Sequence, residues 1–320
     1  GFTSVFIPVD DPLYLTDGFK FRFRNYSTLA GNLDHWHVDY VFLDSNIDPE
    51  NFDVVEIAFV DPVNTLLNEF TAMPWTHFVP NAASFMLDQT ETISKNLSVS
   101  QADNIQSGFK VEYAETGAIQ DFENDFQTVI VNPFEEFEVP YFVNDGTVEN
   151  FVYDTTVNDT CATFDVTFYQ DAIGLLSSEK LGVLDNDSIG FEQEFSNYYA
   201  YDDGSAESVY ALQNQAGAKV AMRYNIAQAD TLLGLFIHFT PFQNDNSNET
   251  FLMRAWDNDG GVPGNELGDN FSFKSPNYFT DGYDVMAYYE YDDPMQVSGT
   301  IYVGIVQNNA VDMNFGMDRN

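Results

Sequence analysis

The sequence predicts an all-β protein made of tandem antiparallel β-sandwich or jelly-roll-like domains. Apolar and polar residues alternate with a period of two in many short runs, which puts one face of each strand in a core and the other in water. Polar turn strings such as NDGT, DNDS and DNDGGVPGN separate these runs. The chain also contains 30 Phe and 18 Tyr, residues that are enriched in strands. These three observations favour antiparallel sheets.

The strand-like runs extend along the whole chain. In the first run, three basic residues alternate with three aromatic ones: Phe19, Lys20, Phe21, Arg22, Phe23 and Arg24. The other runs are 35–43, 52–60, 126–134, 137–143, 161–169, 218–226, 231–239, 250–256 and 300–306. Only residues 62–70, PVNTLLNEF, have a pattern that suits a short helix. No GxGxxG motif follows a strand, which argues against a Rossmann fold.

The length of 320 residues exceeds what one hydrophobic core usually serves, so we expect several domains. Composition shifts near DSNIDPEN and DNDSIGFEQEFSN suggest the boundaries. We expect residues 1–46 to be the terminal strands of a β module that begins upstream. Residues 47–190 then form a middle β-sandwich domain, and residues 196–320 a C-terminal β-sandwich or jelly-roll domain.

The charge of the chain restricts its partners. The 11 Lys+Arg against 51 Asp+Glu give a formal net charge of -40. Such a field repels nucleic acid and anionic lipid headgroups, so we expect neither as a partner. The 44% hydrophobic content is too high for a disordered tail. The acidity therefore suits either a salty, cation-rich setting or solubility alone.

The export and redox features of the sequence are few. No apolar stretch of about 18 residues occurs, so we expect no membrane insertion. No signal peptide is recognisable at Gly1, and we interpret the chain as the mature part of a longer exported protein. Cys161 is the only cysteine, which excludes an intrachain disulfide, and we expect it to be a buried, inert thiol.

The string WDNDGGVPGN is the first candidate metal site. Asp257 and Asp259 lie two residues apart and precede Gly260 and Gly261, which let the backbone carbonyls turn toward an ion. Hard oxygen ligands at this spacing suit calcium. The alternative is a tight β-turn in which these side chains bond their own backbone.

The string YDDGSAES is the second candidate metal site. Asp202, Asp203 and Glu207 surround Gly204 near the expected start of a strand. If these carboxylates converge they need a cation, again calcium, because like charges so close cannot all stay ionised unaided. The alternative is a solvated hairpin tip. Similar, weaker pairs are Asp292 with Asp293 and Asp185 with Asp187.

A histidine cluster and a set of tyrosines are the other candidates for ligand binding. His35, His37 and Asp39 share a strand face, but one histidine pair is too few for zinc, so we expect half-exposed histidines beside a core Trp36. Tyr199 and Tyr201 share another face and could stack on sugar rings. Packing in the core or at a sheet edge is the alternative. Further candidates for such stacking are Tyr198, Tyr288, Tyr289 and Tyr291, while Trp75 is expected to fill the core.

No motif for catalysis stands out. The chain has no GxSxG nucleophile elbow and no HExxH metal motif. A carboxylate pair for glycoside hydrolysis remains an alternative, because 51 acidic residues bring some carboxylates together in any β protein. We therefore expect a protein that is not an enzyme, with glycosidase or protease activity left as an alternative.

Two stretches resemble modules of secreted Bacteroidetes proteins. The run FRFRNYSTLAGNLDHWHVDYVFLD (21–44) resembles the last strands of their MAM-like, jelly-roll modules. The block YYAYDDGSAESVYAL (198–212), with DTLLGLFIHF (230–239) and WDNDGGVPGN (256–265), is similar to β-sandwich modules that precede the sorting domain of type IX secretion substrates. The resemblance implies an exported protein, at the outer surface or released, with repeated β modules.

These observations lead to one expected function and one alternative. We expect an extracellular structural or adhesion module of a bacterial surface or secreted protein, stiffened by calcium. Its partners would be other extracellular modules or copies of itself. The alternative is a carbohydrate-binding module attached to a larger secreted enzyme, with glycan as its ligand.

Overall fold

The computed structural model describes most of the chain. The described residues run from 3 to 318, with gaps at 4, 27–35, 39–40, 44, 46, 51–52, 55, 64, 123–128, 144–149, 174–186, 214, 241–244, 280 and 283. The side chains at 121, 122, 142 and 172 also lie outside the description. The chain divides into two compact units, Gly1–Asp53 and Val54–Asn320. The sequence had suggested the first boundary at about residue 46.

The first unit forms no helix or strand in its described part. Large apolar side chains there are exposed, and Trp36 is 67% exposed. The core position expected for Trp36 is therefore wrong, because no sheet forms around it within the described residues. His37 is exposed, whereas His35 and Asp39 lie outside the described residues.

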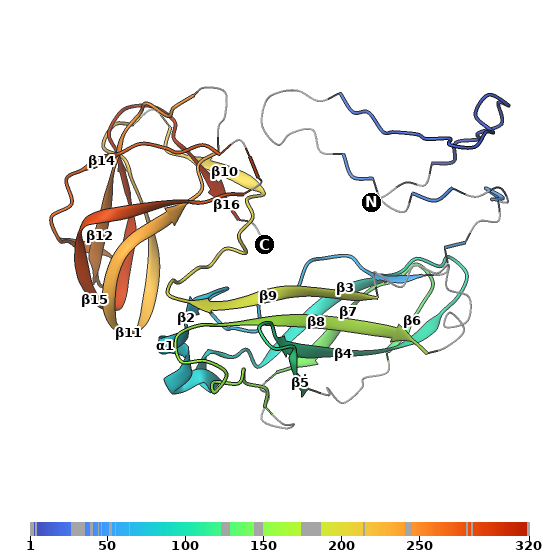
Figure 1. The fold of residues 1–320 in the computed structure, drawn as a ribbon, viewed down its shortest axis with the longest axis horizontal. Helices are drawn as coiled ribbons and strands as arrows, with labels where there is room; N and C mark the ends of the chain where they lie inside the picture. The colour runs from blue at the N-terminus through green and yellow to red at the C-terminus, as the bar shows by residue number, and fades with distance from the viewer. Residues whose placement is uncertain are drawn as a thin grey trace. The chain divides into compact units, whose positions relative to one another are not determined.

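The second unit is built from several, mainly antiparallel, sheets, which confirms the all-β fold class (Figure 1). Its first sandwich combines a three-stranded sheet, in the order β1-β3-β7, with a larger sheet in the order β2-β9-β8-β4-β5, where β6 also pairs with β4. The bounds are β1 Ile57–Phe59, β2 Met73–Pro74, β3 Gln89–Asn96, β4 Asp103–Tyr113, β5 Ala118–Phe122, β6 Val129–Val131, β7 Glu136–Phe142, β8 Ala162–Ala172 and β9 Ser188–Ser196.

The core of this sandwich lies between its two sheets. Tyr141 of β7 meets Phe109 of β4 and Phe168 of β8, with ring centroids 6.3 and 4.8 Å apart. A short helix α1 (Trp75–Phe78) and a 3₁₀ helix η1 (Val79–Phe85) follow β2. Trp75 is fully buried in this core, as predicted, and its ring lies 5.2 Å from Phe195.

The helix predicted at residues 62–70 does not form. The backbone of this segment pairs with other segments instead of with itself: Leu87 donates to the carbonyl of Leu66, and Asn68 donates to the carbonyl of Phe85. Leu66 and Phe70 are both buried in the core. Tertiary pairing and burial therefore decide the conformation of a segment whose local pattern was ambiguous.

Two long strands pair with each other in the second sandwich. Its larger sheet has the order β11-β15-β12-β13, with β14 also paired to β12, and a separate two-stranded sheet joins β10 to β16. The two runs predicted at 218–226 and 231–239 form one strand, β11, with register shifts between Ile226 and Asp230 and between Leu232 and Gly234. The bounds are β10 Ser208–Ala211, β11 Lys219–Ile237, β12 Phe251–Asp259, β13 Val262–Leu267, β14 Phe273–Lys274, β15 Ala287–Gln307 and β16 Asn314–Met317.

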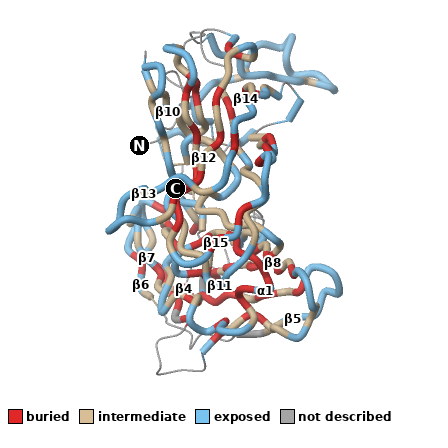
Figure 2. The backbone as a smooth tube through the Cα atoms, turned by 90° about the vertical axis from the view of Figure 1, so that its left-hand side faces the viewer, coloured by how far each residue is buried: buried red, intermediate tan, exposed pale blue. Residues whose placement is uncertain are grey.

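A second hydrophobic core belongs to this sandwich. Phe239 contacts Phe251, Tyr289 and Phe315, with ring centroids 5.2–5.9 Å apart. In Figure 2 the buried residues lie mainly on strands of the two sandwiches, whereas turns and connections are largely exposed, as is much of β11. The second unit thus contains two cores. The buried residues of the first core lie between Ile57 and Phe195, and those of the second between Phe239 and Met313.

Strand alternation also sets the exposure of the single cysteine. The buried residues of β8 include Ala162, Phe164 and Val166, so the positions between them face outward. Cys161 falls in the outward series and is exposed. The buried thiol expected from the sequence is therefore wrong. Among the described residues, no helix has the length and apolar character needed to span a membrane.

Candidate functional site

The β12–β13 hairpin holds the first predicted metal loop. Asp259 pairs with Val262, so Gly260 and Gly261 alone make the turn, with φ angles of 64° and 97°. Two successive positive φ values are typical of a type I′ hairpin, which favours glycine at both positions. Asp257 Oδ1 accepts the backbone N–H of Asn265 at 2.6 Å. This geometry fits the β-turn alternative for Asp257 and Asp259.

The second predicted loop contributes to a group of three carboxylates. Oxygens of Asp203, Glu207 and Asp318 lie within 4.8 Å of one another. Strands β10 and β16 explain the convergence, because Ser208 pairs with Met317, which brings the residues just outside that pair together. We call these three residues the acidic triad. The sequence predicted two of its members and missed Asp318.

Hydrogen bonds hold the loop side of the acidic triad in place. The backbone N–H of Asp203 donates to Asp318 Oδ2 at 3.0 Å. Ser205 donates from its backbone and its hydroxyl to Asp203 Oδ1, at 2.8 and 2.6 Å, and its hydroxyl also lies 2.5 Å from Glu207 Oε1. Three carboxylates and a hydroxyl provide the hard oxygen donors that calcium prefers.

Asp202, the third predicted member, has a different environment. Its Oδ1 accepts the backbone N–H of Gly204 at 3.2 Å, and its carbonyl accepts the hydroxyl of Thr71 at 2.5 Å. Burial raises the pKa of its carboxyl above the usual range, and the nearby charges of Asp318 and Asp203 add to this. Asp202 therefore anchors the loop to the first sandwich, whereas Asp203 belongs to the acidic triad.

The weaker acidic pairs have structural roles where they are described. Asp292 Oδ2 accepts the backbone N–H groups of Phe271 and Ser272 at 3.0 and 2.7 Å. The hydrogen bonds from Ser272, with Lys274 nearby, hold the pKa of the Asp292 carboxyl below its usual range. The backbone N–H of Asp293 donates to Asn270 at 3.3 Å. Asp185 lies outside the described residues.

Tyr199 and Tyr201 pack where the two sandwiches meet. Their rings lie 4.8 and 5.0 Å from the ring of Phe70, and Tyr224 of β11 stacks on Phe70 at 6.4 Å. Burial raises the pKa of Tyr199 and of Tyr201 to about 12. The geometry thus fits the packing alternative for these two residues rather than an open platform for sugar rings.

A polar chain runs beside these rings. His77 Nδ1 lies 2.7 Å from the Tyr199 hydroxyl, and His77 Nε2 lies 3.2 Å from Asp230 Oδ2. The Tyr199 hydroxyl also accepts the backbone N–H of Ala227 at 3.0 Å. Gln228 donates to the carbonyl of Thr76 at 3.0 Å. Residues 227–230, at the register shift of β11, thus bond to α1 and to Tyr199. We call this set of contacts the joint.

Other aromatic residues do form an exposed group. Phe236 of β11 pairs with Tyr288 of β15, their ring centroids are 5.0 Å apart, and the residues are 53% and 48% exposed. The ring of Tyr198 lies 5.9 Å from that of Phe236. A Cβ on Gly234 would lie 2.7 Å from ring atoms of Tyr288, so this ring lies close against the strand. We call Tyr198, Phe236 and Tyr288 the aromatic platform.

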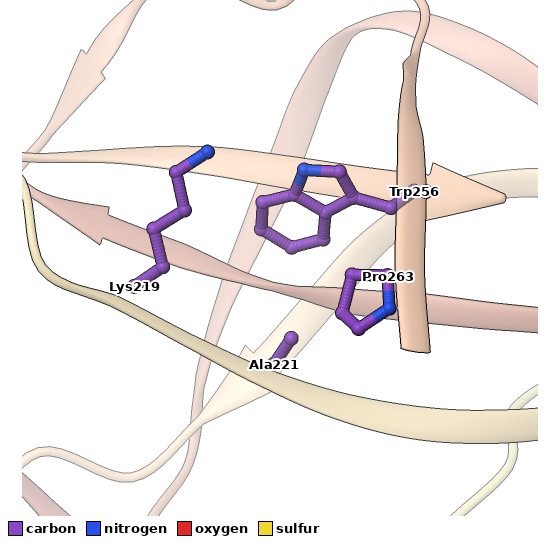
Figure 3. A pocket seen from close by; sticks show the side chains of 5 residues that line it. Lys219, Ala221, Trp256 and Pro263 are labelled. Atoms are coloured by element: carbon purple, nitrogen blue, oxygen red, sulfur yellow. The ribbon is translucent and has the colours of Figure 1, made fainter. Parts of the chain in front are cut away.

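A cavity of about 410 Å³ lies on the outward face of the β11-β15-β12-β13 sheet. Figure 3 shows Lys219 and Pro263 beside the ring of Trp256, and Ala221 and Gly264 complete the lining. Lys219 Nζ lies 5.5 Å from the centroid of the Trp256 ring, and Trp256 is only 3% exposed. The lysine therefore covers the indole. Lys219 Nζ also lies 3.5 Å from Glu266 Oε1, so its charge is paired.

The fold and these sites define a class of protein: an acidic, all-β protein of the sandwich type. A scan against protein-family models finds no match to this chain, and a search of curated proteins finds none either. The function is therefore argued from the sites themselves.

Proposed function

We propose that this chain is an extracellular structural or adhesion module of a bacterial cell-surface or secreted protein, and that calcium stiffens it. The observation that carries the proposal is the convergence of Asp203, Glu207 and Asp318. A cation shared by these carboxylates would tie the loop that follows β9 to the residue that follows β16. It would thereby fasten the connection between the sandwiches.

The charge of the chain supports this proposal. With a formal net charge of -40, the folded chain repels itself, and bound divalent cations relieve that repulsion where acids gather. Extracellular modules bind calcium with dissociation constants of about 0.1–1 mM, which matches a site with few protein ligands. The resemblance to modules of type IX secretion substrates agrees with export to the outer surface.

Thermal unfolding in calcium and in chelator, at matched ionic strength, tests the proposal. We expect a higher melting temperature in calcium, and sodium at equal ionic strength should not reproduce the shift. An equal melting temperature in both buffers would remove the calcium part of the proposal, and the acidity would then serve solubility alone.

The aromatic platform favours a second candidate, a carbohydrate-binding module attached to a larger secreted enzyme. The exposed rings of Phe236 and Tyr288 offer a surface on which a sugar ring can stack. Glu290, on the same strand face as Tyr288, is exposed and could accept hydrogen bonds from sugar hydroxyls. A glycan array separates this candidate from the first, because a purely structural module would bind no glycan.

A further inference from the structure

An amphipathic segment of the first unit lacks a sheet partner among the described residues. Its side chains alternate between an apolar and a basic series: Phe19, Phe21 and Phe23 in one, Lys20, Arg22 and Arg24 in the other. Successive rings of the apolar series lie 6.3 and 5.7 Å apart, as expected for side chains on one side of the backbone. We call residues 19–24 the basic ladder.

Two of the three rings of the apolar series are open to solvent, whereas Phe19 is half-buried and lies 6.2 Å from the ring of Tyr14. Phe21 and Phe23 are 52% and 59% exposed. At about 25 cal/mol per Å² of apolar surface, covering such rings is strongly favourable, and their exposure marks a contact surface. A partner has to supply an apolar strip and hydrogen bonds for an extended backbone.

The basic series indicates the charge of that partner. Lys20, Arg22 and Arg24 are three of the 11 Lys+Arg, in a chain with 51 Asp+Glu. Three cations within five residues are thus an exception in this chain. Their partner should be acidic, and a second copy of the chain meets that requirement.

Strand β7 has the complementary pattern. It is the last strand of the β1-β3-β7 sheet and pairs with β3 alone among the described residues. Phe137, Val139 and Tyr141 point toward the core, where Val139 and Tyr141 are fully buried, while Glu136 and Glu138 are exposed.

The two patterns match when the basic ladder is added beside β7. The phenylalanines would extend the inward face, and the cations would lie beside Glu136 and Glu138 on the outward face. Opposite charges across neighbouring strands stabilise their pairing. Pro140 lacks a backbone N–H, which confines the new ladder to the start of β7.

We propose that the basic ladder of one copy adds to the free edge of β7 in a second copy, as in β-strand addition. The inference rests on the structural role proposed above, because it names the partner for that role. Donor and acceptor are different patches, so the contact is heterologous, and it either closes reciprocally in a dimer or extends into a longer assembly.

Sedimentation velocity of the full chain over a range of concentrations tests the inference. We expect concentration-dependent association that weakens at least tenfold in Arg22→Glu and in Glu138→Arg. The double charge swap, Arg22→Glu with Glu138→Arg, should restore it. Lys110→Glu, at a half-exposed residue of β4, and Asp259→Arg, at an exposed hairpin tip, apply the same charge changes elsewhere and should leave association unchanged.

Two results would overturn the inference: a wild-type chain that stays monomeric at every concentration, or association that survives both single charge reversals. Circular dichroism shows whether each variant is folded. Calcium-dependent melting is read on the same samples. A monomer that still melts higher in calcium would retain the calcium-stiffened structural role and lose only the strand pairing.

Discussion

The Tyr199 hydroxyl lies 2.7 Å from His77 Nδ1, and this contact places the histidine between the tyrosine and a carboxylate of β11. The hydroxyl oxygen also accepts the backbone N–H of Ala227 at 3.0 Å. A carboxylate only accepts hydrogen bonds, so His77 Nε2 donates to Asp230 Oδ2 at 3.2 Å. A buried histidine thus joins the connection after β9 to the middle of β11.

We expect Tyr199→Phe to destabilise the joint. The change keeps the ring on Phe70 but removes the partner of Nδ1 on the buried His77 and of the N–H of the exposed Ala227. Water can replace the partner of Ala227, whereas an unsatisfied polar group on the buried histidine costs about 1–3 kcal/mol. Urea unfolding should report a loss in that range for Tyr199→Phe. Tyr210→Phe, at an exposed position, is the control and should change little. Equal stabilities of the two variants would contradict the role of the joint.

Tyr199 and Tyr201 should make the protein sensitive to alkali. Burial raises the pKa of Tyr199 and of Tyr201 to about 12, against about 10 in the unfolded chain. Between these values the unfolded chain has lost phenol protons that the folded chain keeps. The free energy of unfolding therefore keeps its full value below about pH 10 and falls as the pH rises toward 12.

Urea unfolding at several pH values in that window measures the effect. We expect the free energy of unfolding to decrease with pH in the wild type, and less steeply in Tyr199→Phe. The absorbance of tyrosinate should rise together with unfolding. An unchanged slope in the variant would show that other tyrosines dominate the alkaline transition.

Much of the strand content could be predicted from alternation alone. The runs at 137–143, 161–169 and 250–256 correspond to β7, β8 and β12. Alternation reports which residues face a core, but it does not give strand partners. The joint was missed for that reason: His77 and Asp230 meet only because β11 passes α1, and neither has a local sequence signal.

The acidic triad shows the same limit, because local sequence patterns do not give strand partners. The cluster of Asp203 and Glu207 is visible locally, whereas Asp318 lies 115 residues after Asp203 and reaches it through the register of β10 and β16. The loop of Asp257 and Asp259 shows what local spacing leaves open. Its two glycines fit a hairpin turn as well as they fit an ion site, and local spacing cannot separate the two.

We expect Asp318→Asn to abolish the calcium dependence of melting. It removes one charge of the acidic triad and leaves a side chain of the same shape. At a calcium concentration of 100 times the dissociation constant, the wild type should gain about 2.7 kcal/mol. Asp259→Asn makes the same change at the hairpin and should keep the full gain. If both variants lose the gain equally, or if neither does, calcium does not bind at the acidic triad.

The aromatic platform gives the last prediction. If the chain binds glycans, Tyr288→Ala should weaken binding at least tenfold, or about 1.4 kcal/mol, because it removes an exposed ring. Tyr210→Ala removes a ring of equal exposure, 48%, from β10 and should leave affinity unchanged. Isothermal titration with a glycan identified on the array measures both variants. Tyr201→Ala disturbs the packing around Phe70, so it should lower stability more than affinity. If Tyr201→Ala instead removes binding in a folded variant, the sugar site lies at the joint, and the platform has another role.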